Sequence, residues 1–262
     1  MTIIITGTST GIGFALAEFF GKKGHRVFGL SRKNVKSQYF KTIPTDITDN
    51  LQVQHAVSEI VKTEKNIDVL INNAGMGMVG AVEDSTKEDI LKLFNLNLVG
   101  AVQMMTAVLP VMREQKSGKI INISSIGSEM GLPFRGFYSA SKSALDKVTE
   151  AIRYEVSPWN IAVCTLHLGD IKTKIAENRV KTKVSEPYQK TFEKIYSIMN
   201  AHVDDGTEPL EVAEYIDKLL TKKSWKAHYY FGKFGQKIGV PLKWILPQNF
   251  YENLMRKYNQ MD

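Results

Sequence analysis

The N-terminal segment constrains the fold more than any other part of this chain, because it has the pattern of a strand, a glycine-rich turn and a helix. The apolar residues 2–6 are followed at once by a turn that contains Gly7, Gly11 and Gly13, and an apolar-periodic helix begins at Phe14. Gly7 allows a tight turn, Gly11 lets a ligand approach the backbone, and Gly13 allows close helix packing. Since the first amides of a helix bind anions, this segment predicts a phosphate-binding turn.

Glycines alone are weak evidence for such a site. Their spacing here differs from the common G-x-G-x-x-G pattern, and an ordinary glycine-rich structural turn is the alternative. A glycine-rich turn binds a ligand where it joins a strand to a helix in a parallel sheet that is covered by helices on both faces, so the rest of the chain decides between the two alternatives.

The rest of the chain has this context, because short apolar runs alternate with helical patterns. The runs that we interpret as strands are residues 2–6, 26–30, 67–71, 119–124 and 161–167. Strands that alternate with helices pair in parallel through right-handed crossovers. We therefore predict an α/β fold, a Rossmann-type doubly wound parallel sheet with helices on both faces. With 262 residues, of which 43% are hydrophobic, residues 1–262 are expected to form a single domain.

Two segments depart from this alternation. Residues 172–206 are polar and lysine-rich around one helical stretch, where a compact α/β fold needs only a short loop, so we expect a substrate lid. Residues 241–262 are expected to form a C-terminal helical tail. Elsewhere, Ser85 and Glu88 have the spacing of a capping box and predict that Ser85 caps the helix that follows.

Composition limits the cellular setting and the partners. The single cysteine, Cys164, excludes an intrachain disulfide and fits a reducing compartment. Because the chain opens on a strand and no apolar run reaches spanning length, we expect a soluble, cytoplasmic protein. The formal net charge of +7 suits a nucleic acid, an acidic membrane, a polyanionic small molecule or a merely solvated surface. The basic residues are scattered and no recognition motif accompanies them, so we expect no nucleic-acid partner.

The end of the second predicted strand distinguishes the two nicotinamide dinucleotides. An NAD site places an acidic residue there to bind the ribose hydroxyl, whereas this chain has Ser31, Arg32 and Lys33. A guanidinium at Arg32 can bind a 2′-phosphate through paired hydrogen bonds, so we expect NADP(H), with NAD(H) the less favoured cofactor. A solvated loop is the alternative for these basic residues. Farther along, Asp46 either contacts the adenine or caps the helix that starts near Asp49.

A candidate catalytic pair lies on one helix. Tyr138 and Lys142 are four residues apart in an apolar-periodic pattern, so their side chains share a face. Tyrosine has a reference pKa of about 10 and needs a neighbouring cation to stabilise its anion, which Lys142 can supply. Ser125 follows the strand predicted at 119–124, at the carboxyl edge where such sheets bind ligands, and its hydroxyl can polarise a substrate oxygen. For the Tyr/Lys motif alone, an exposed amphipathic pair is the alternative.

Several motifs, in the same order, resemble those of the single-domain short-chain dehydrogenase/reductase family, and they cover about the first 180 residues. They are TGTSTGIG from Thr6, NNAG from Asn72, NLVG from Asn97, INISS from Ile121, YSASK from Tyr138 and GDIKT from Gly169. Independent motifs at matching separations argue against accidental agreement.

The resemblance implies an enzyme that interconverts an alcohol and a carbonyl. It implies that Tyr138 acts as acid or base and that Lys142 lowers the pKa of this tyrosine and binds the nicotinamide ribose. It implies that Ser125 holds the reacting oxygen and that Asn97 anchors a water linking Lys142 to solvent. The cofactor contacts that we expect are Gly7, Ser9, Thr10, Gly11, Ile12, Gly13, Ser31, Arg32, Asp46, Ile47, Asn73, Ala74, Gly75, Tyr138, Lys142, Gly169, Ile171 and Thr173.

The chain departs from the family pattern at two positions. Leu168 stands where family members usually have proline, which leaves open the backbone path beside the nicotinamide. Thr10 stands where many NADP-specific members have a basic residue, which weakens the NADP(H) prediction. Thr173 retains the family's threonine near the nicotinamide amide, with a helix cap as the alternative. His167 closes a strand without an accompanying nucleophile or metal spacing, so we interpret it as packing and expect no metal site.

The stretch from Met130 to Val156 most resembles the subgroup that contains 17-beta-hydroxysteroid dehydrogenases and retinol dehydrogenases. This implies a hydrophobic alcohol or ketone, which is steroid-, retinoid- or lipid-like. The apolar side chains that either line a pocket or form ordinary core are Met76, Met78, Met130, Leu132, Phe134 and Phe137. The resemblance also implies a homodimer or homotetramer, assembled through helices at about 95–115 and 137–157.

Two other hypotheses stand beside the enzyme. The first is a non-catalytic NADP(H)-sensing or scaffold protein, against which the intact set of four candidate catalytic residues argues. The second adds a membrane-surface contact through the tail, where Lys243, Arg256 and Lys257 accompany apolar residues. These apolar residues are Trp244, Ile245, Leu246, Phe250, Tyr251, Leu254, Met255 and Tyr258. We favour packing of the tail on the domain or on a partner subunit.

Overall fold

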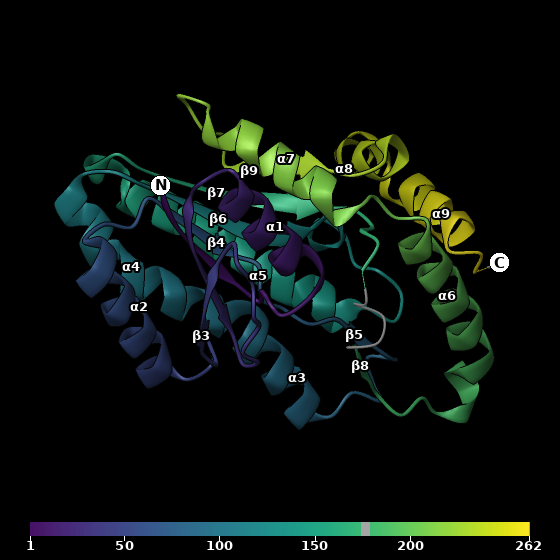
Figure 1. The fold of residues 1–262 in the computed structure, drawn as a ribbon. Coiled ribbons are helices and arrows are strands. Elements are labelled where there is room, and N and C mark those ends of the chain that lie inside the picture. Colours follow the sequence, from purple (N-terminus) through teal and green to yellow (C-terminus); the bar gives the residue numbers. More distant parts are fainter. Residues whose placement is uncertain (174–178, 262) are drawn as a thin grey trace.

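A computed structural model describes residues 1–173 and 179–261 and has one large parallel sheet at its centre (Figure 1). Its strand order is β3-β2-β1-β4-β6-β7-β9, and every neighbouring pair runs in parallel. The strands are β1 (Thr2–Thr6), β2 (Arg26–Ser31), β3 (Lys41–Pro44), β4 (Val69–Asn72), β6 (Gly118–Ser125), β7 (Ile161–Leu168) and β9 (His228–Phe231). The chain order reverses between β1 and β4, and ligands bind at such a point in doubly wound sheets. The predicted fold class is confirmed.

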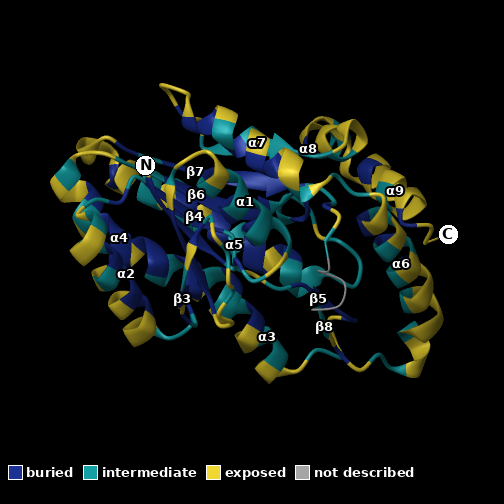
Figure 2. Cartoon of the chain, in the orientation of Figure 1, coloured by how far each residue is buried: buried dark blue, intermediate teal, exposed yellow. Residues whose placement is uncertain are grey.

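Helices cover both faces of the sheet. Ile3 and Ile5 pack in a cluster with α1 (Gly11–Lys22) and α7 (Pro209–Leu220), whereas Ile4 packs on the opposite face. That face is covered by α2 (Asn50–Glu64), α4 (Ala101–Gln115) and α5 (Gly136–Glu155). Figure 2 shows the sheet as the most buried layer of the molecule. Burial from both sides explains why the strands are apolar runs rather than alternating patterns.

Three local features add to what the sequence predicted. The Asp49 side chain accepts the amides of Leu51 and Gln52 and so caps α2. The expectation that Ser85 caps the next helix is wrong. Thr86 caps α3 (Lys87–Phe94) instead, because its hydroxyl accepts the amide of Asp89. Strand β9 was not predicted, although the aromatic run that forms it is typical of a strand.

The segment in which we expected a lid forms a strand and a helix within the described residues. Strand β8 (Val180–Lys181) pairs with β5 (Met78–Val79), and α6 (Glu186–Asp204) follows it. Residues 174–178 of the expected lid lie outside the described residues. The segment is therefore attached to the loop that follows β4.

Two helices complete the chain at one end of the molecule, beside α6 (Figure 1). They are α8 (Phe234–Ile245) and α9 (Gln248–Tyr258). The rings of His202 on α6 and Tyr258 on α9 lie 5.7 Å apart. The expected helical tail thus consists of the end of α8 and the whole of α9. Of residues 241–262, Asp262 lies outside the described residues.

Among the described residues, one helical stretch, Lys87–Gln115, is long and apolar enough to cross a membrane by length and composition. It comprises α3, a π-helical turn (Asn95–Gly100) and α4. Leu93, Met104 and Val108 on this stretch are completely buried. This is the packing of a core helix.

Candidate active site

The candidate catalytic residues meet where β6 ends beside the first turns of α5. The Ser125 hydroxyl hydrogen-bonds Tyr138 and also accepts the amide of Gly127 at 3.0 Å. Lys142 is buried, and its Nζ atom donates to the carbonyl of Ile123 at 2.9 Å. Ser125 and Ile123 at the end of β6 therefore orient the side chains of Tyr138 and Lys142 on α5.

Asn97 joins this group from the π-helical turn between α3 and α4. Its Oδ1 atom accepts the amide of Met76 at 2.8 Å, and its Nδ2 atom donates to the Met76 carbonyl and to the Ser141 hydroxyl. Ser141 in turn donates to the carbonyl of Tyr138 at 2.8 Å. Isolated π-helical turns occur frequently at functional sites, and this one links the loop after β4 to α5.

Gly75 leaves open the space between Asn97 and Lys142. A Cβ atom built on Gly75 would lie 3.1 Å from Oδ1 of Asn97 and 3.3 Å from Nζ of Lys142. Five predicted site residues, including Ser125 and Tyr138, are therefore gathered at one place on the carboxyl edge of the sheet.

Burial controls the electrostatics of this group. It lowers the pKa of Lys142 to about 8, although the carboxylate of Asp146 acts in the opposite direction. Burial raises the pKa of Tyr138, while the hydrogen bond from Ser125 and the charges of Arg135 and Arg179 act to lower it. These three neighbours all favour the tyrosine anion.

A polar stripe along α5 extends the site in a way that the sequence analysis missed. Tyr138, Lys142, Asp146 and Glu150 follow one another at four-residue intervals and so lie along one face of α5. Asp146 is buried, and its Oδ2 atom lies 3.7 Å from Nδ1 of His167. The four-residue spacing was visible in the sequence and could have identified Asp146 as the charge next to Lys142.

His167 belongs to a hydrogen-bonded network rather than to apolar packing alone. Its Nε2 atom lies 3.0 Å from Nδ1 of His228, and Nε2 of His228 lies 3.0 Å from a carboxylate oxygen of Glu150. Its ring also stacks on Tyr230 with the centroids 4.6 Å apart. Burial lowers the pKa of His167, which favours the neutral ring. In the part of the chain that the structure describes, no cluster of acidic, histidine or cysteine side chains could hold a metal ion.

The glycine-rich turn has the geometry of an anion site. Gly7 and Gly11 have φ angles of 74° and 60°, in the left-handed region that glycine adopts without strain. A Cβ atom on Gly13 would lie 2.3 Å from the Gly7 carbonyl oxygen, so only glycine fits there. Thr10 precedes α1 without a side-chain cap. The first amides of α1 therefore remain available to a phosphate.

Two other segments with predicted cofactor residues lie against this turn. The Thr6 hydroxyl accepts the amides of Asn73 and Ala74 at 3.0 and 2.9 Å, which fixes the loop after β4. On the other side, a Cβ atom on Gly11 would lie 3.4 Å from the Thr173 side chain. Ser9 and Ile12 lie within the turn and the first turn of α1.

The segment after β7 is held by backbone contacts. The Gly169 amide donates to the Phe231 carbonyl at 2.8 Å, and Ile171 forms a parallel bridge with Thr207. Leu168, where the family usually has proline, is buried at the end of β7 and pairs with Phe231.

The residues expected at the adenine end lie beyond β2 and β3. Arg32 is exposed, and the Ser31 hydroxyl donates to the Lys33 carbonyl. Asp46 accepts the amide and the hydroxyl of Thr48, and Ile47 is buried. Asp46 therefore shapes the turn before α2, while the cap itself is Asp49.

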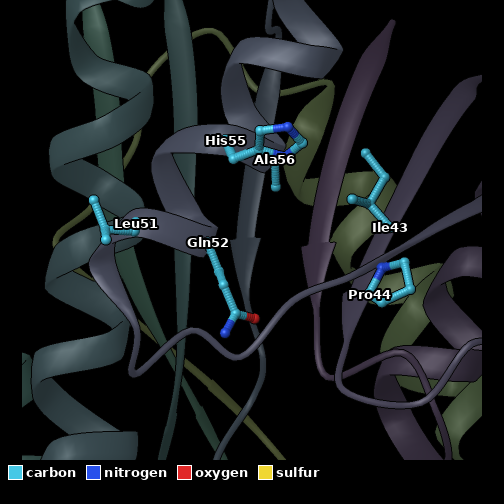
Figure 3. Close-up of a pocket in the computed structure, with 6 residues that line it drawn as sticks. All are labelled: Ile43, Pro44, Leu51, Gln52, His55 and Ala56. Atoms are coloured by element: carbon cyan, nitrogen blue, oxygen red, sulfur yellow. The ribbon is translucent and has the colours of Figure 1, made fainter.

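A pocket of about 360 Å³ lies between β3 and α2 (Figure 3). Its lining residues are Ile43, Pro44, Leu51, Gln52, His55 and Ala56. Gln52 also accepts the amide of Asp46, so the pocket borders the turn expected at the adenine end. None of the predicted catalytic residues lines it.

Comparisons with known proteins bear on the family and the fold of this chain. The family model described as short chain dehydrogenase matches residues 1–184. A 3-ketodihydrosphingosine reductase of Bacteroides thetaiotaomicron is 38% identical over 258 residues, which are 97% of this chain and 96% of the relative. An NADPH-dependent 3-dehydrocapnine reductase of Ornithobacterium rhinotracheale is 32% identical over 86% of this chain and 82% of the relative.

Solved structures give the same result for the fold. A short-chain dehydrogenase from Streptomyces avermitilis superposes with a TM-score of 0.84 at 24% identity, over 100% of this chain and 99% of that one. The structure of ElxO with NADP bound superposes with a TM-score of 0.72 at 28% identity, over 87% of this chain and 94% of that one.

Proposed function

Since the chain belongs to the short chain dehydrogenase family, we propose that it is an NADP(H)-dependent oxidoreductase that interconverts a carbonyl and a secondary or primary alcohol. The observation that carries this proposal is the meeting of Ser125, Tyr138 and Lys142 with Gly75 and Asn97 at the carboxyl edge of the sheet. The glycine-rich turn at the start of α1 lies at the same edge.

The residues around the turn fit NADP(H). Gly7, Gly11 and Gly13 leave room for a pyrophosphate, and exposed Arg32 is free of any carboxylate partner among residues 1–173 and 179–261. A guanidinium in that position suits a 2′-phosphate. One relative is named as NADPH-dependent, and the similar ElxO structure holds NADP. When bound, the reduced cofactor supplies the hydride for the carbonyl carbon.

The protein's own part in reduction is proton transfer and charge stabilisation. Tyr138 donates its phenolic proton to the carbonyl oxygen, and Ser125 donates a hydrogen bond to the same oxygen as negative charge develops. Charged Lys142 stabilises the tyrosine anion that remains. Asn97 keeps a free acceptor lone pair on Oδ1 after its contact with Met76, and this lone pair can hold the water that returns a proton.

A hydrophobic substrate is the third part of the proposal, and among steroid-, retinoid- and lipid-like compounds we favour a long-chain lipid ketone. Two relatives are named as reductases of 3-ketodihydrosphingosine and 3-dehydrocapnine. In this chain Phe134 contacts the rings of Phe192 and Tyr188 on α6, with centroids 5.4 and 6.3 Å apart. These rings offer apolar surface close to Tyr138.

We also propose that residues 1–262 form a single domain in which α6 acts as a lid over the substrate. Its contacts with Phe134 and the pairing of β8 with β5 place it beside the loops that carry Arg135 and Gly77. The buried thiol of Cys164 suits a reducing compartment, so we propose a cytoplasmic enzyme.

A homodimer or homotetramer through α4 and α5 completes the proposal. A surface depression of about 270 Å³ lies between these helices, lined mainly by apolar residues. They include Leu98, Val99, Val102 and Val148. Apolar surface of this kind suits a subunit interface.

The experiment is a comparison of Tyr138→Phe with wild-type protein, with NADPH affinity and reduction of a long-chain ketone measured on the same samples. We expect turnover to fall by about a thousandfold while NADPH affinity is unchanged. Tyr154→Phe, at an exposed position on the same helix, is the matched control and should match wild type. Wild-type turnover in Tyr138→Phe would end the proposal. NADPH binding without consumption by any ketone would favour the non-catalytic sensor.

A further inference from the structure

Two arginines that the sequence analysis left without a role lie beside the candidate catalytic tyrosine. Arg135 immediately precedes α5, one turn before Tyr138, and Arg179 immediately precedes β8. Both guanidinium groups act electrostatically on Tyr138 and on each other. Two cations therefore act together on this tyrosine.

Backbone hydrogen bonds attach the segments that carry the two arginines to the residues on either side of β5. The Gly80 amide donates to the carbonyl of Phe134, the residue before Arg135, at 2.9 Å. The Val180 amide, which follows Arg179, donates to the Gly77 carbonyl at the same distance. Phe134 has a φ angle of 56°, which is rare for an aromatic residue and persists only where surrounding contacts impose it.

Neither arginine has a carboxylate partner among residues 1–173 and 179–261. The Nε atom of Arg135 is buried and makes no hydrogen bond. Arg179 donates to neutral groups, the Asn200 side chain at 2.8 Å and the hydroxyl of Tyr196. The charge of Asp170 acts on both arginines, but the hydrogen bond of its Oδ2 atom is to Gln236.

Burial lowers the pKa of both guanidinium groups, yet arginine stays protonated in proteins. Two partly desolvated cations that repel each other, and that have no carboxylate partner in the part of the chain that the structure describes, are unfavourable unless an anion joins them. Guanidinium groups bind carboxylate, phosphate and sulfonate oxygens through paired hydrogen bonds.

We propose that Arg135 and Arg179 bind an anionic head group of the substrate, so that the enzyme acts on an amphiphilic ketone with a negative charge near its carbonyl. This inference rests on the proposed function. The head group would lie between the two arginines, the carbonyl at Tyr138 and Ser125, and the apolar chain against Phe134 and the rings of α6.

The test uses two ketones of equal size, a long-chain 2-oxoalkane-1-sulfonate and the corresponding neutral methyl sulfone. We expect wild-type enzyme to prefer the sulfonate in kcat/KM. Arg135→Gln and Arg179→Gln should each lower kcat/KM for the sulfonate by at least about tenfold, with little change for the sulfone. Arg113→Gln, an exposed position on α4, is the matched control and should leave both values unchanged.

Equal losses for both ketones would overturn the proposal, because they would mean that the arginines act on Tyr138 or on folding. A wild-type preference for the sulfone would also overturn it, while leaving the proposed reductase intact. If neither ketone is reduced, the proposal is tested by calorimetry, which compares the binding of an alkyl sulfonate with that of the corresponding alkyl methyl sulfone. Tighter binding than that of the alkyl methyl sulfone, lost when both arginines are replaced, supports the head-group site, and equal binding refutes it.

A second inference comes from different observations, on the outward surfaces of α8 and α9. On α8, Phe234, Ile238 and Ile245 are exposed at helical spacing, and Trp244 lies beside them with 75% of its surface accessible. On α9 the exposed apolar residues, again at four-residue spacing, are Phe250, Leu254 and Tyr258. These seven residues define the tail surface.

The inner sides of both helices already pack on the protein. Val240, Tyr251 and Asn259 are buried, and the Tyr251 hydroxyl contacts the Met130 sulfur at 3.4 Å. The sequence analysis favoured packing of the tail on the domain or on a partner subunit. Packing on the domain accounts for Tyr251 and leaves the tail surface exposed.

Charge distinguishes the partners that could cover the tail surface. Residues 233–261 contain five lysines and arginines and one carboxylate, Glu252. Lys237, Arg256 and Lys257 are exposed. A second copy packed about a two-fold axis would bring like charges together. Aromatic and aliphatic side chains flanked by cations match the interface of an anionic bilayer.

We infer that the tail surface docks on an anionic lipid membrane, beside the loops that carry Met130 and Asp170. Co-sedimentation with vesicles of phosphatidylcholine alone and of equimolar phosphatidylcholine and phosphatidylglycerol tests this inference. Wild-type protein should bind the anionic vesicles. Replacing Trp244, Ile245 and Phe250 together by serine should weaken binding by at least about tenfold.

The matched control replaces three exposed apolar residues on other helices, Leu91, Tyr154 and Leu210, by serine and should bind like wild type. Replacing Lys237, Arg256 and Lys257 together by glutamine should weaken binding by about a hundredfold. Equal binding to both vesicle types, or none, would overturn the inference. So would a dimer in ultracentrifugation that the serine variant dissociates. Vesicle binding is measured without any turnover, so its outcome is independent of the proposed function. NADPH-dependent turnover of a soluble ketone should be unchanged in every variant.

Discussion

The region up to β7 and the region after it differ in how the apolar residues of their helices are covered. In the first, apolar residues fill both faces of the sheet, and the polar groups of Asn97, Thr6 and Asp49 bond to backbone amides. In the second, the apolar residues of the tail surface are exposed on two neighbouring helices, α8 and α9. The first region therefore holds most of the apolar core around the sheet, whereas the tail surface of the second is left exposed by the described residues.

The largest test of this comparison is stability. Leu166 in β7 is completely buried, and Leu166→Ala should lower the free energy of unfolding by about 2–5 kcal/mol. Trp244→Ala on α8 should change it by less than about 0.5 kcal/mol. Urea unfolding measures both. A loss at Trp244 as large as that at Leu166 would mean that the tail surface is covered within the protein and would remove the contrast.

The second test concerns the cofactor end of the first region. Arg32→Ala should weaken NADPH binding by about ten- to a hundredfold and leave NADH binding unchanged, because only NADPH has a 2′-phosphate. Fluorescence titration with both nucleotides measures the difference. Lys33→Ala, at the neighbouring exposed position, is the control. If it weakens NADPH binding as much as Arg32→Ala does, the effect follows from the loss of any positive charge there and not from the Arg32 guanidinium.

The third test compares two glycines. In Gly13→Ala the new Cβ atom meets the Gly7 carbonyl, so unfolding free energy should fall by about 1–3 kcal/mol and NADPH binding should weaken. In Gly235→Ala the new Cβ atom has no neighbour within 4 Å, and an alanine in α8 should stabilise by up to about 1 kcal/mol. Destabilisation at Gly235 would contradict the open packing of α8.

The smallest effect is expected on the pH profile. Lys142 has a pKa of about 8, so kcat/KM should fall as pH rises through about 8 and the lysine loses its charge. Asp146→Asn removes the carboxylate that raises this pKa, so the fall should begin at lower pH. Glu155→Gln, exposed at the end of α5, is the control. An unchanged profile in Asp146→Asn would mean that Asp146 does not act on Lys142.

The same pKa predicts how stability depends on pH. In the unfolded chain Lys142 has the ordinary pKa of 10.5, so the folded state releases this proton first. Burying the charged lysine therefore opposes folding below about pH 8, and this cost disappears between about pH 8 and the ordinary value. Replacing Lys142 by methionine should remove this part of the pH dependence of unfolding.

The sequence predicted the first region well because its signals are local. The glycine-rich turn, the Tyr138/Lys142 spacing and the apolar strands each lie within one short stretch, and the fold that they imply is confirmed. The specific roles of Ser125, Tyr138, Lys142 and Asn97 stay predictions.

The features that were missed depend on contacts between distant segments. Arg135 and Arg179 act on each other because β8 pairs with β5, and His167 reaches His228 because β9 lies beside β7. No local pattern carries such information. The cap at Thr86 was missed for the opposite reason, because Ser85 and Thr86 are equally good caps by composition and only the local backbone decides between them.

The burial of Cys164 has a practical consequence. It is the only cysteine, it lies in β7 with no accessible surface, and burial raises the pKa of its thiol. The native protein therefore reacts poorly with thiol reagents. A cysteine introduced at exposed Lys190 on α6 would be the sole labelling site. A spectroscopic probe attached there could follow the position of this helix relative to the sheet without any prior engineering of the chain.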